Sequence, residues 1–534
     1  MGLIGDSPAS GMETPITIDG TASPPVQKQP KDHTERMLKA RHVQLLGIGG
    51  VIGTLTFVGI GKTLIVSGPA SLLIAFIFWC TVVLALTNCI SEMVSYLPIS
   101  SPFITFAGRY VDDAFEAAVG LNFFLLEAFL VPFEIVSCNI IIQFWTDSIP
   151  IAAVIVVLMI VLSLANVFGV KYFGTTEFWL AMGKIILFLG LTFYTIVTMS
   201  GGNPTRHAYG FENWYKPAPF LEYHVPGPKG VFLGFLKALS LASVTITGPE
   251  YVSMTAGEVE FPRRVMPRAF KAVFWRLGLI FVVSALTVGI VVPPNSKELA
   301  EAYGQNGANA AASPYVVSMR SFGIPVLPHI VNALLFTSAF SAGNGYFFCA
   351  TRTLYGLALA GKVPRIFART TEKGVPIYPT VAVLVISCVA FLQVGSGASV
   401  VFSWLISLVT SGQLINSAAC CVVYLRFRKA YMTQGVPREN FPYMGYLQPY
   451  SAYYGIFWTV LMAFVSGFDV FLKGHWDLPT FLFSYFTIGL FPVVYIMYKL
   501  TKRPSFIRSK TADLRTGLET IELHESTHVP KPSR

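Results

Sequence analysis

Four ionisable residues stand inside long apolar stretches of the sequence, where they could bind a charged solute or carry a proton. They are Glu127, Glu134, Lys184 and Glu250. An ionisable side chain at membrane depth costs several kcal/mol, so each one is a candidate for substrate or proton binding. Glu127 and Glu134 are seven residues apart and share one face of a helix, with a rise of about 10 Å between them. A buried carboxyl at Glu127 would favour a cationic substrate or would be protonated, and the sequence leaves both readings open.

The composition indicates that these residues belong to an integral membrane protein. Of the 534 residues, 53% are hydrophobic and only 12% are charged, about half the charged fraction of a soluble domain. The formal net charge of +10 is assigned to loops, where basic residues gather on one side of the membrane, and not to a nucleic-acid surface. The 7 cysteines form no CxxC pair and have no metal-ligand spacing, so we expect no metal or other cofactor.

Apolar runs of the length that crosses a bilayer predict about twelve transmembrane helices. They lie near 44–66, 70–97, 117–145, 150–169, 175–200, 231–256, 270–292, 327–360, 379–397, 400–425, 452–473 and 478–499. Residues 1–40 and 503–534 are poor in large apolar side chains and are predicted to be disordered tails. Lysine and arginine predominate in the loops on the side of these tails, which predicts that both tails are cytosolic and flank a transporter domain at 41–502.

Two of the predicted helices carry residues that interrupt a helix, and they occupy matching places in two halves of five helices. The first reads GIGGVIGTLTFVGIG from Gly47, and the sixth reads SVTITGPEYVSMTAGE around Gly248 and Pro249. Proline removes a backbone donor and clashes with the preceding turn, so the sixth helix should unwind there. Unwound backbone is tolerated at membrane depth only where it lines a cavity, and paired breaks of this kind mark the substrate site of inverted-repeat transporters. Close helix packing is the alternative role for the glycines.

Several motifs together resemble the fungal amino-acid permeases of the amino acid–polyamine–organocation superfamily. They are RHVQLLGIGGVIGT at 41–54, SEMVSYLPIS at 91–100, Pro132-x-Glu134, TEFWLAMGK at 176–184, AGEVEFPRRVMPRAFKAVFWR at 256–276, SAGNGYFFCATRTLYGLALAGKVPR at 341–365 and LQPYSAYYGIF at 447–457. The resemblance implies an all-α LeuT-like fold, with two inverted repeats of five helices and two additional helices. It also implies proton-coupled import of amino acids at the plasma membrane.

The resemblance and the predicted breaks together assign roles to individual residues. The substrate-binding residues would be Val51, Gly53, Thr54, Leu55, Thr56, Glu134, Ile246, Thr247, Gly248 and Glu250. Backbone N–H groups around Thr54 would bind the cargo carboxylate, and carbonyls near Ile246 would bind its ammonium group, with Glu134 nearby. Glu250 would cap the second half of the sixth helix, whose N-terminus favours negative charge. Further candidate cargo contacts are Glu127, Ser341 and Asn344, although close packing also explains the small-residue run at 341–345.

Proton coupling is assigned to Lys184 together with Glu134. Lys184 matches a lysine that proton-coupled relatives have where sodium-coupled ones hold a cation, and burial brings a lysine pKa towards the useful range. Snorkelling of Lys184 to the membrane interface is the alternative. Snorkelling is also the expected role of Lys237, and Glu92 is expected to pair with arginines of the loops on the tail side.

Three positions around the presumed pocket depart from the family pattern, so the usual substrates do not follow automatically. Leu55 replaces a glycine in the first helix, Ile246 replaces an aromatic residue in the sixth, and Glu127 stands where relatives often have Trp. Two alternatives therefore stay open: transport of a polyamine or amino-acid-derived metabolite, and a receptor that senses amino acids with little flux. No nucleophile–base pair, metal cluster or phosphate loop indicates an enzyme. Lys28, Lys31 and Lys39 in the N-terminal tail are candidate sites for ubiquitin-dependent trafficking.

Overall fold

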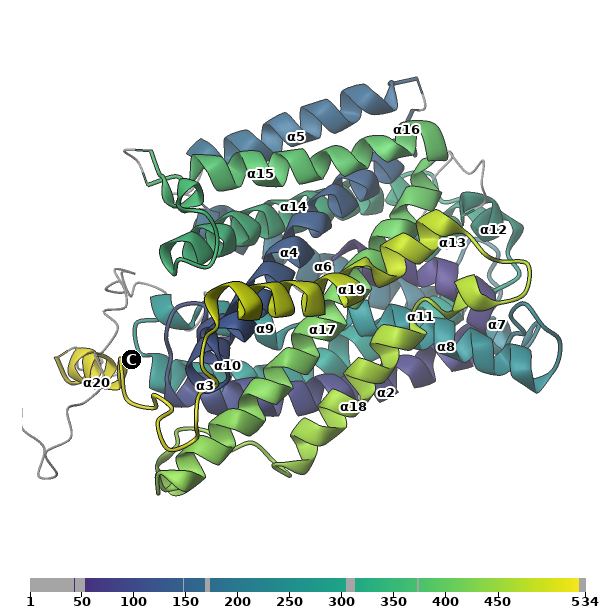
Figure 1. The fold of residues 1–534 in the computed structure, drawn as a ribbon. Helices are drawn as coiled ribbons and strands as arrows, with labels where there is room; N and C mark the ends of the chain where they lie inside the picture. Colours follow the sequence, from purple (N-terminus) through teal and green to yellow (C-terminus); the bar gives the residue numbers. More distant parts are fainter. Residues whose placement is uncertain are drawn as a thin grey trace, which may run out of the picture. The chain divides into compact units, whose positions relative to one another are not determined.

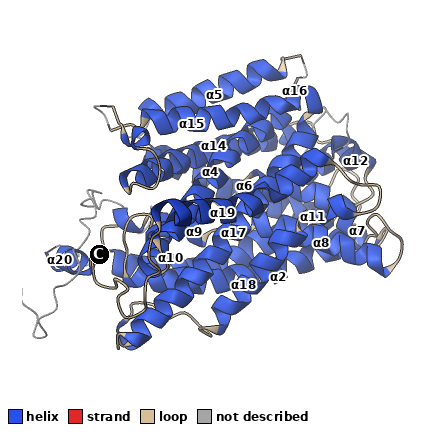
Figure 2. Ribbon diagram, in the orientation of Figure 1, coloured by secondary structure: helices blue, strands red, loops and turns tan. Residues whose placement is uncertain are grey.

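The computed structural model describes Val43, residues 53–146, 148–168, 173–303, 313–371 and 374–527. The predicted disordered tail at 1–40 and the candidate residue Val51 lie outside these described residues. The described part of the chain is built of helices and the loops between them, and no strand is drawn in it (Figure 2). Residues 34–534 form one compact unit, which contains all the described helices.

The helices coincide with the predicted membrane spans. The span helices are η1 (Leu55–Gly59), α2 (Ile60–Tyr96), α4 (Asp113–Ile142), α5 (Ile151–Phe168), α6 (Phe173–Met199), α8 (Pro228–Thr245), α9 (Pro249–Met254), α10 (Pro262–Arg276), η4 (Leu277–Val282), α11 (Val283–Val291), α14 (Leu327–Leu359), α15 (Ile377–Ser387), η6 (Cys388–Leu392), α16 (Gln393–Ser396), α17 (Ala398–Thr433), α18 (Tyr450–Val465) and α19 (Leu478–Lys502). Within α2, Gly68 has φ 78° and separates the first span from the second. The first predicted span is described only from Gly53 onwards, and each of the other eleven coincides with one helix or a set of consecutive helices.

Length and composition support membrane insertion of these helices. Eight helices or runs of helices among the described residues are long and apolar enough to cross a membrane, and Ile151–Val167 and Tyr450–Val465 are shorter apolar helices. Burial distinguishes central from peripheral spans: 78% of the apolar window of α4 is buried, against 17% for α19. The apolar side chains that α19 leaves uncovered, such as Leu500 and Val493, suit contact with lipid, where no hydrophobic penalty applies.

Helices in corresponding places of the two halves pack against each other. The third and eighth spans, α4 and α14, are in contact, as are the fourth and ninth, α5 and α15, and the second and seventh, α2 and α11. Figure 1 shows α5, α15 and α14 running beside one another at the top of the view, with α4 beneath them. This pairing is the arrangement expected of two repeats of five helices, and α18 and α19 add to it by packing on α17.

The C-terminal segment is ordered through residue 527, so the prediction of a disordered tail is wrong for residues 503–527. The Ile507 N–H donates to the Val111 carbonyl at 2.9 Å, and Arg426 donates to the Ile507 carbonyl at 2.5 Å. The segment ends in α20 (Leu518–Thr527), where Ile521 is 2% exposed. A few buried apolar side chains and arginines from distant helices, such as Arg426 of α17, hold this segment in place, and neither is visible in its local composition. We call the side of the molecule on which it lies the tail side.

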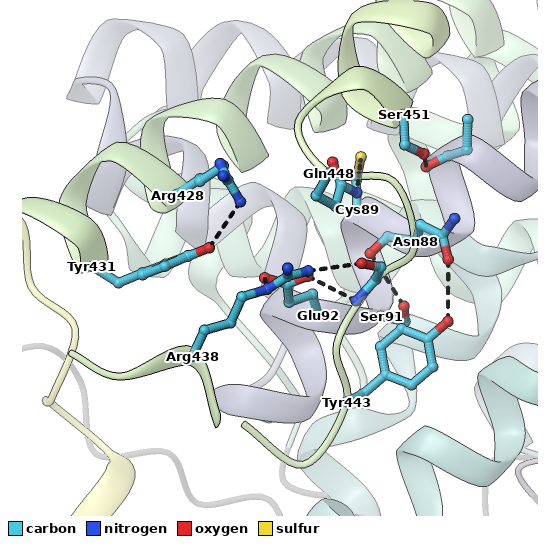
Figure 3. A network of polar contacts seen from close by, with 12 residues as sticks. Asn88, Cys89, Ser91, Glu92, Arg428, Tyr431, Arg438, Tyr443, Gln448 and Ser451 are labelled. Carbon is cyan, nitrogen blue, oxygen red and sulfur yellow. Dashed lines mark hydrogen bonds and ion pairs between the residues drawn. The ribbon is translucent and has the colours of Figure 1, made fainter. Parts of the chain in front are cut away.

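Glu92 and Arg438 form a buried ion pair on the tail side, which confirms the prediction for Glu92. Arg438 donates to the two Glu92 oxygens at 3.0 and 2.6 Å, and the Gly445 N–H adds a third bond at 2.8 Å. Figure 3 shows these contacts, with the Tyr443 hydroxyl bonded to Asn88 one turn earlier at 3.1 Å. The network fastens the end of the second span to the loop between α17 and α18 (Figure 3).

Candidate functional site

The sixth span is broken, and the break has a clear cause in the sequence. α8 ends at Thr245, Ile246 is extended, and Gly248 has φ 153°, a conformation that is open almost only to glycine. α9 then begins at Pro249, in the first helical turn where a missing backbone donor does no harm. The predicted interruption is therefore present, but the chain unwinds at 246–248, just before the proline and not at it.

The first span is irregular at the same depth. Gly53 lies outside any helix, Thr54 has helical angles, and Leu55–Gly59 form a π-helical turn. Such wide turns occur mostly at functional sites. Leu55, the departure from the family pattern, is accommodated because the wide turn does not require a glycine there, and its side chain packs over Gly59.

A small cavity lies between the two irregular segments. The space open to the centre of a water-sized molecule is ≈ 30 Å³, which is room for about two or three waters. The lining residues are Gly53, Thr54, Leu55, Leu126, Leu130, Phe133, Glu134, Val244, Thr245, Thr247, Tyr251, Tyr346, Val409 and Gln413. They come from the first, third, sixth, eighth and tenth spans. Gly53, Thr54, Leu55, Glu134 and Thr247 were predicted site residues, and the structure brings all five to this cavity.

Glu134 joins the third span to the first at the cavity wall. Its side chain is 2% exposed, and its Oε2 accepts a hydrogen bond from the Thr54 hydroxyl at 2.6 Å. Neighbouring glycines allow the helices to approach this carboxyl. A Cβ on Gly53 would lie 3.6 Å from Glu134 Oε1, and one on Gly343 would lie 3.2 Å from the Glu134 Cβ. Glu134 is therefore a carboxyl at the cavity, held by one hydroxyl and by close backbone contacts.

Lys184 lies behind this carboxyl and does not line the cavity. It is 1% exposed on α6, so it does not reach the membrane interface. Its electrostatic neighbours are Glu177 and Glu134. A buried ammonium group needs such carboxylates to remain charged.

Glu250 lines a second, smaller cavity beside the main one. Gln413 Nε2 donates to Glu250 Oε1 at 2.8 Å, and the Gly248 N–H points to Glu250 Oε2 at 3.4 Å, the capping contact expected at the start of α9. The second cavity has ≈ 10 Å³ of space for water-sized centres and is lined by Ile246 and Glu250 among others. Thr247 and Gln413 line both cavities and form the wall between them.

The other predicted residues do not line the main cavity. Ser341 donates to both oxygens of Glu177 at 3.0 Å. Asn344 Oδ1 accepts a hydrogen bond from Asn166 at 2.8 Å. These two candidate cargo contacts are engaged in contacts between helices instead.

Three more predicted residues, Glu127, Thr56 and Gly248, also lie off the main cavity. Glu127 is fully buried and accepts a hydrogen bond from the Tyr251 hydroxyl at 3.0 Å, which places it behind the cavity wall. Lys237, expected to snorkel, is instead paired with Asp469 of η8 (Phe468–Phe471), the short helix that follows α18.

Sequence reasoning missed Tyr251, Tyr346 and Gln413. The two tyrosine rings lie 6.2 Å apart between centroids and supply the aromatic wall that Ile246 cannot. Tyr251 follows Glu250 directly, which was a usable signal. Gln413 lies in a long stretch without charged residues, where an amide has no charge to mark it out.

Comparison with known proteins agrees with this architecture. Residues 42–509 match the sequence model of the family described as Amino acid permease. The chain is 45% identical over 500 residues to the general amino acid permease AGP2 of Saccharomyces cerevisiae, covering 92% of this chain and 84% of that protein. It is 36% identical to the proline-specific permease of Emericella nidulans, covering 92% and 89%, and 33% identical to the dicarboxylic amino acid permease of S. cerevisiae, covering 97% and 86%.

A solved structure supports the fold. The manganese transporter of Eremococcus coleocola superposes with a TM-score of 0.51 at 13% identity, over 86% of this chain and 93% of that chain. At this identity the likeness concerns the fold alone, which is LeuT-like, as the resemblance in the sequence implied. With the broken sixth span, the family match and relatives above 30% identity along nearly the whole chain, this membrane protein belongs to the amino acid permease family.

Proposed function

We propose that this protein is a secondary active transporter that imports amino acids and is driven by protons. The observation that carries the proposal is the cavity between the two irregular spans, with the Glu134 carboxyl hydrogen-bonded to Thr54 at its wall. Family membership supports an amino-acid cargo, because the related proteins are named as amino acid permeases.

The cargo carboxylate would bind backbone N–H groups near Thr54, at the start of the π-helical turn. Free N–H groups at a helix start attract anions. The cargo ammonium would meet the carbonyl groups of Ile246 and Thr247 in the extended segment, together with Glu134. The cavity of ≈ 30 Å³ is too small for a whole amino acid, so loading requires outward movement of a lining helix or side chain.

Proton coupling would use Lys184 and Glu134. Lys184 is buried and has carboxylates as its electrostatic neighbours, so its protonation depends on the charge of those groups. Binding of a cargo ammonium at Glu134 would remove part of the negative charge that stabilises the Lys184 ammonium. Cargo binding would thereby promote release of the proton. For import driven by protons this release must follow reorientation of the loaded carrier, so that the proton leaves on the tail side together with the cargo.

Uptake in a permease-deficient host tests the proposal. Labelled amino acids should accumulate, faster at acidic than at neutral outside pH, and a competition panel of all amino acids and common polyamines identifies the cargo. Lys184→Ala should remove the dependence on pH, and Lys184→Arg should do the same, since arginine keeps the charge but does not release its proton. If Lys184→Ala left uptake as dependent on pH as in the wild type, the coupling role would be refuted. Binding without flux would favour a receptor.

We also propose that the protein acts in the plasma membrane with both tails in the cytosol. The excess of lysine and arginine in loops of the tail side supports this orientation. We expect that a fluorescent tag placed after residue 534 is not quenched by an external quencher in intact cells. We also expect ubiquitin to be linked to Lys28, Lys31 or Lys39 during turnover of the protein. Quenching of the tag in intact cells would reverse the orientation.

A further inference from the structure

Glu177 is a buried carboxylate that the cargo site does not use. Its side chain is 4% exposed, and it lies on α6. The Ser341 hydroxyl of α14 is 3.0 Å from each of its two oxygens. One hydroxyl shared between two oxygens leaves much of a carboxylate's hydrogen-bonding capacity unused. This arrangement is a weak compensation for burying a charge.

The position of Glu177 continues the line of ionisable groups that starts at the cavity. Glu177 and Lys184 are seven residues apart on α6, so they share a helix face at a separation of about 10 Å along the axis. Lys184 interacts electrostatically with both Glu177 and Glu134. The ionisable groups therefore follow one another as Glu134, Lys184 and Glu177.

The line runs towards the tail side. Lys499 pairs with Asp112 at the start of α4, and Val111 bonds to Ile507 of the C-terminal segment, so α4 starts on the tail side. The chain then crosses in α4, returns in α5 and enters α6 from the tail side again. Glu177 is the fifth residue of α6, four positions after Phe173, whereas Glu134 is at the central cavity.

Other titratable groups near Glu177 are ordinarily uncharged. From α14 these are Tyr346 and Cys349, which both interact electrostatically with Glu177; Glu134 of α4 is a further carboxyl group, which interacts with Lys184. Among the helices of the described residues, α11 (Val283–Val291) also packs on α6, and it contains no titratable residue. Lys184 is therefore the cation among these groups with which Glu177 can exchange a proton.

We propose that Glu177 is the tail-side station of the proton path: it takes the proton from Lys184 and releases it to the aqueous phase on the tail side. In the first step the Lys184 ammonium becomes an amine and the Glu177 carboxylate becomes a carboxylic acid. In the second step the acid returns its proton to water when the tail side opens. The Ser341 hydroxyl holds the carboxyl in place and links its protonation to the position of α14. The inference rests on the proposed proton-coupled transport.

Glu177→Gln in proteoliposomes tests the role of Glu177 separately from the proposed proton-coupled transport. Glutamine keeps the shape of the side chain and an acceptor for Ser341 but carries no titratable proton. The probe is the labelled amino acid that the wild type transports best in the competition panel. We expect exchange of labelled for unlabelled amino acid to stay within about 2-fold of wild type. Accumulation driven by an imposed proton gradient should fall about 100-fold, the scale typical of losing one proton-transfer group, and the rate should lose its dependence on pH.

Two further variants separate a proton-transfer role from a structural one. Glu177→Asp keeps a titratable group and should restore gradient-driven accumulation in part. Ser341→Ala should keep exchange but shift the pH profile of accumulation.

Unchanged accumulation and an unchanged pH profile in Glu177→Gln would overturn the proposal. Equal loss of exchange and accumulation in both Glu177→Gln and Glu177→Asp would also overturn it, because that result marks a structural role. A wild type that exchanges amino acid but moves no protons would instead contradict the proposed coupling itself.

Discussion

The ion pair between Glu92 and Arg438 should contribute strongly and asymmetrically to the stability of the protein. The Glu92 side chain is 0% exposed, whereas that of Arg438 is 29% exposed. If Glu92 loses its partner, the charge stays buried. If Arg438 loses its partner, the guanidinium can turn towards water. We therefore predict that Arg438→Met destabilises the protein more than Glu92→Gln does.

The burial of the two side chains determines how much stability each substitution removes. Breaking a fully buried pair costs about 3–5 kcal/mol, and this range applies to Arg438→Met because Glu92 would keep only the Gly445 N–H. In Glu92→Gln the partly exposed Arg438 reduces the loss to about 2 kcal/mol, near the value for hydrogen bonds to charged groups. If the pair is broken in the transition state for unfolding, a loss of 2 kcal/mol speeds inactivation by about 30-fold.

The assay is the half-life of the detergent-solubilised protein on heating, measured as the fraction that remains monodisperse by size-exclusion chromatography. A rate is the proper measure because unfolding of such a protein is irreversible. The double variant Glu92→Gln with Arg438→Met should be more stable than Arg438→Met alone, because no charge is then left buried. Equal half-lives of Arg438→Met and the wild type would refute the reasoning. A double variant whose loss is the sum of the single losses would refute it as well.

Three further predictions concern the cavity and the side opposite the tail. Thr54→Val removes the 2.6 Å hydrogen bond to Glu134. It should weaken cargo binding in the competition assay about 10-fold, which corresponds to the lower end of the free energy of a hydrogen bond to a charged group. Thr54→Ser keeps the hydroxyl and should bind cargo as the wild type does. Gln413→Ala joins the two cavities and should improve the apparent affinity for bulkier amino acids about 10-fold relative to small ones; an unchanged order of preference would contradict this. In the loop before α8, burial and then the neighbouring ring of His475 lower the pKa of His224 below 6.5. A lowered pKa means that neutral His224 stabilises the fold above about pH 6.5 and that this contribution is lost as pH falls through the folded-state pKa. His224→Gln should flatten the change in thermal half-life between pH 7.5 and pH 5, and an identical slope would contradict the role of His224.

The spans were predictable because lipid imposes a simple rule on composition. A stretch long enough to cross the hydrocarbon core must be apolar and helical, so hydropathy located the spans. The break in the sixth span was predictable from Gly248 and Pro249, whose backbone preferences are local properties. The prediction missed the place of the unwinding by a few residues, because Pro249 is compatible with the first turn of α9.

The partners of the polar residues could not be predicted in the same way. Ser341 is 164 positions from Glu177 in the sequence, and Gln413 is 163 positions from Glu250. Such pairs depend on how helices that are distant in the sequence pack, which no local pattern encodes. Glu92 was an exception, since a charged residue at the end of a span needs a partner and the nearby loops were rich in arginine. The ordered segment 503–527 was missed because its stabilising contacts come from helices that are distant in the sequence.

The C-terminal segment has a mechanical consequence for transport. Arg263, in the first turn of α10, donates to Glu522 of α20 at 2.9 Å, and Arg109, at the end of α3 (Pro102–Tyr110), donates to the Thr516 carbonyl at 2.8 Å. The segment thus bridges a connector that follows the broken sixth span and another that follows the second. If these two connectors move apart during transport, the contacts of the C-terminal segment must move with them or break. A chain shortened before residue 503 would lack this restraint, so its turnover rate would not represent that of the full chain.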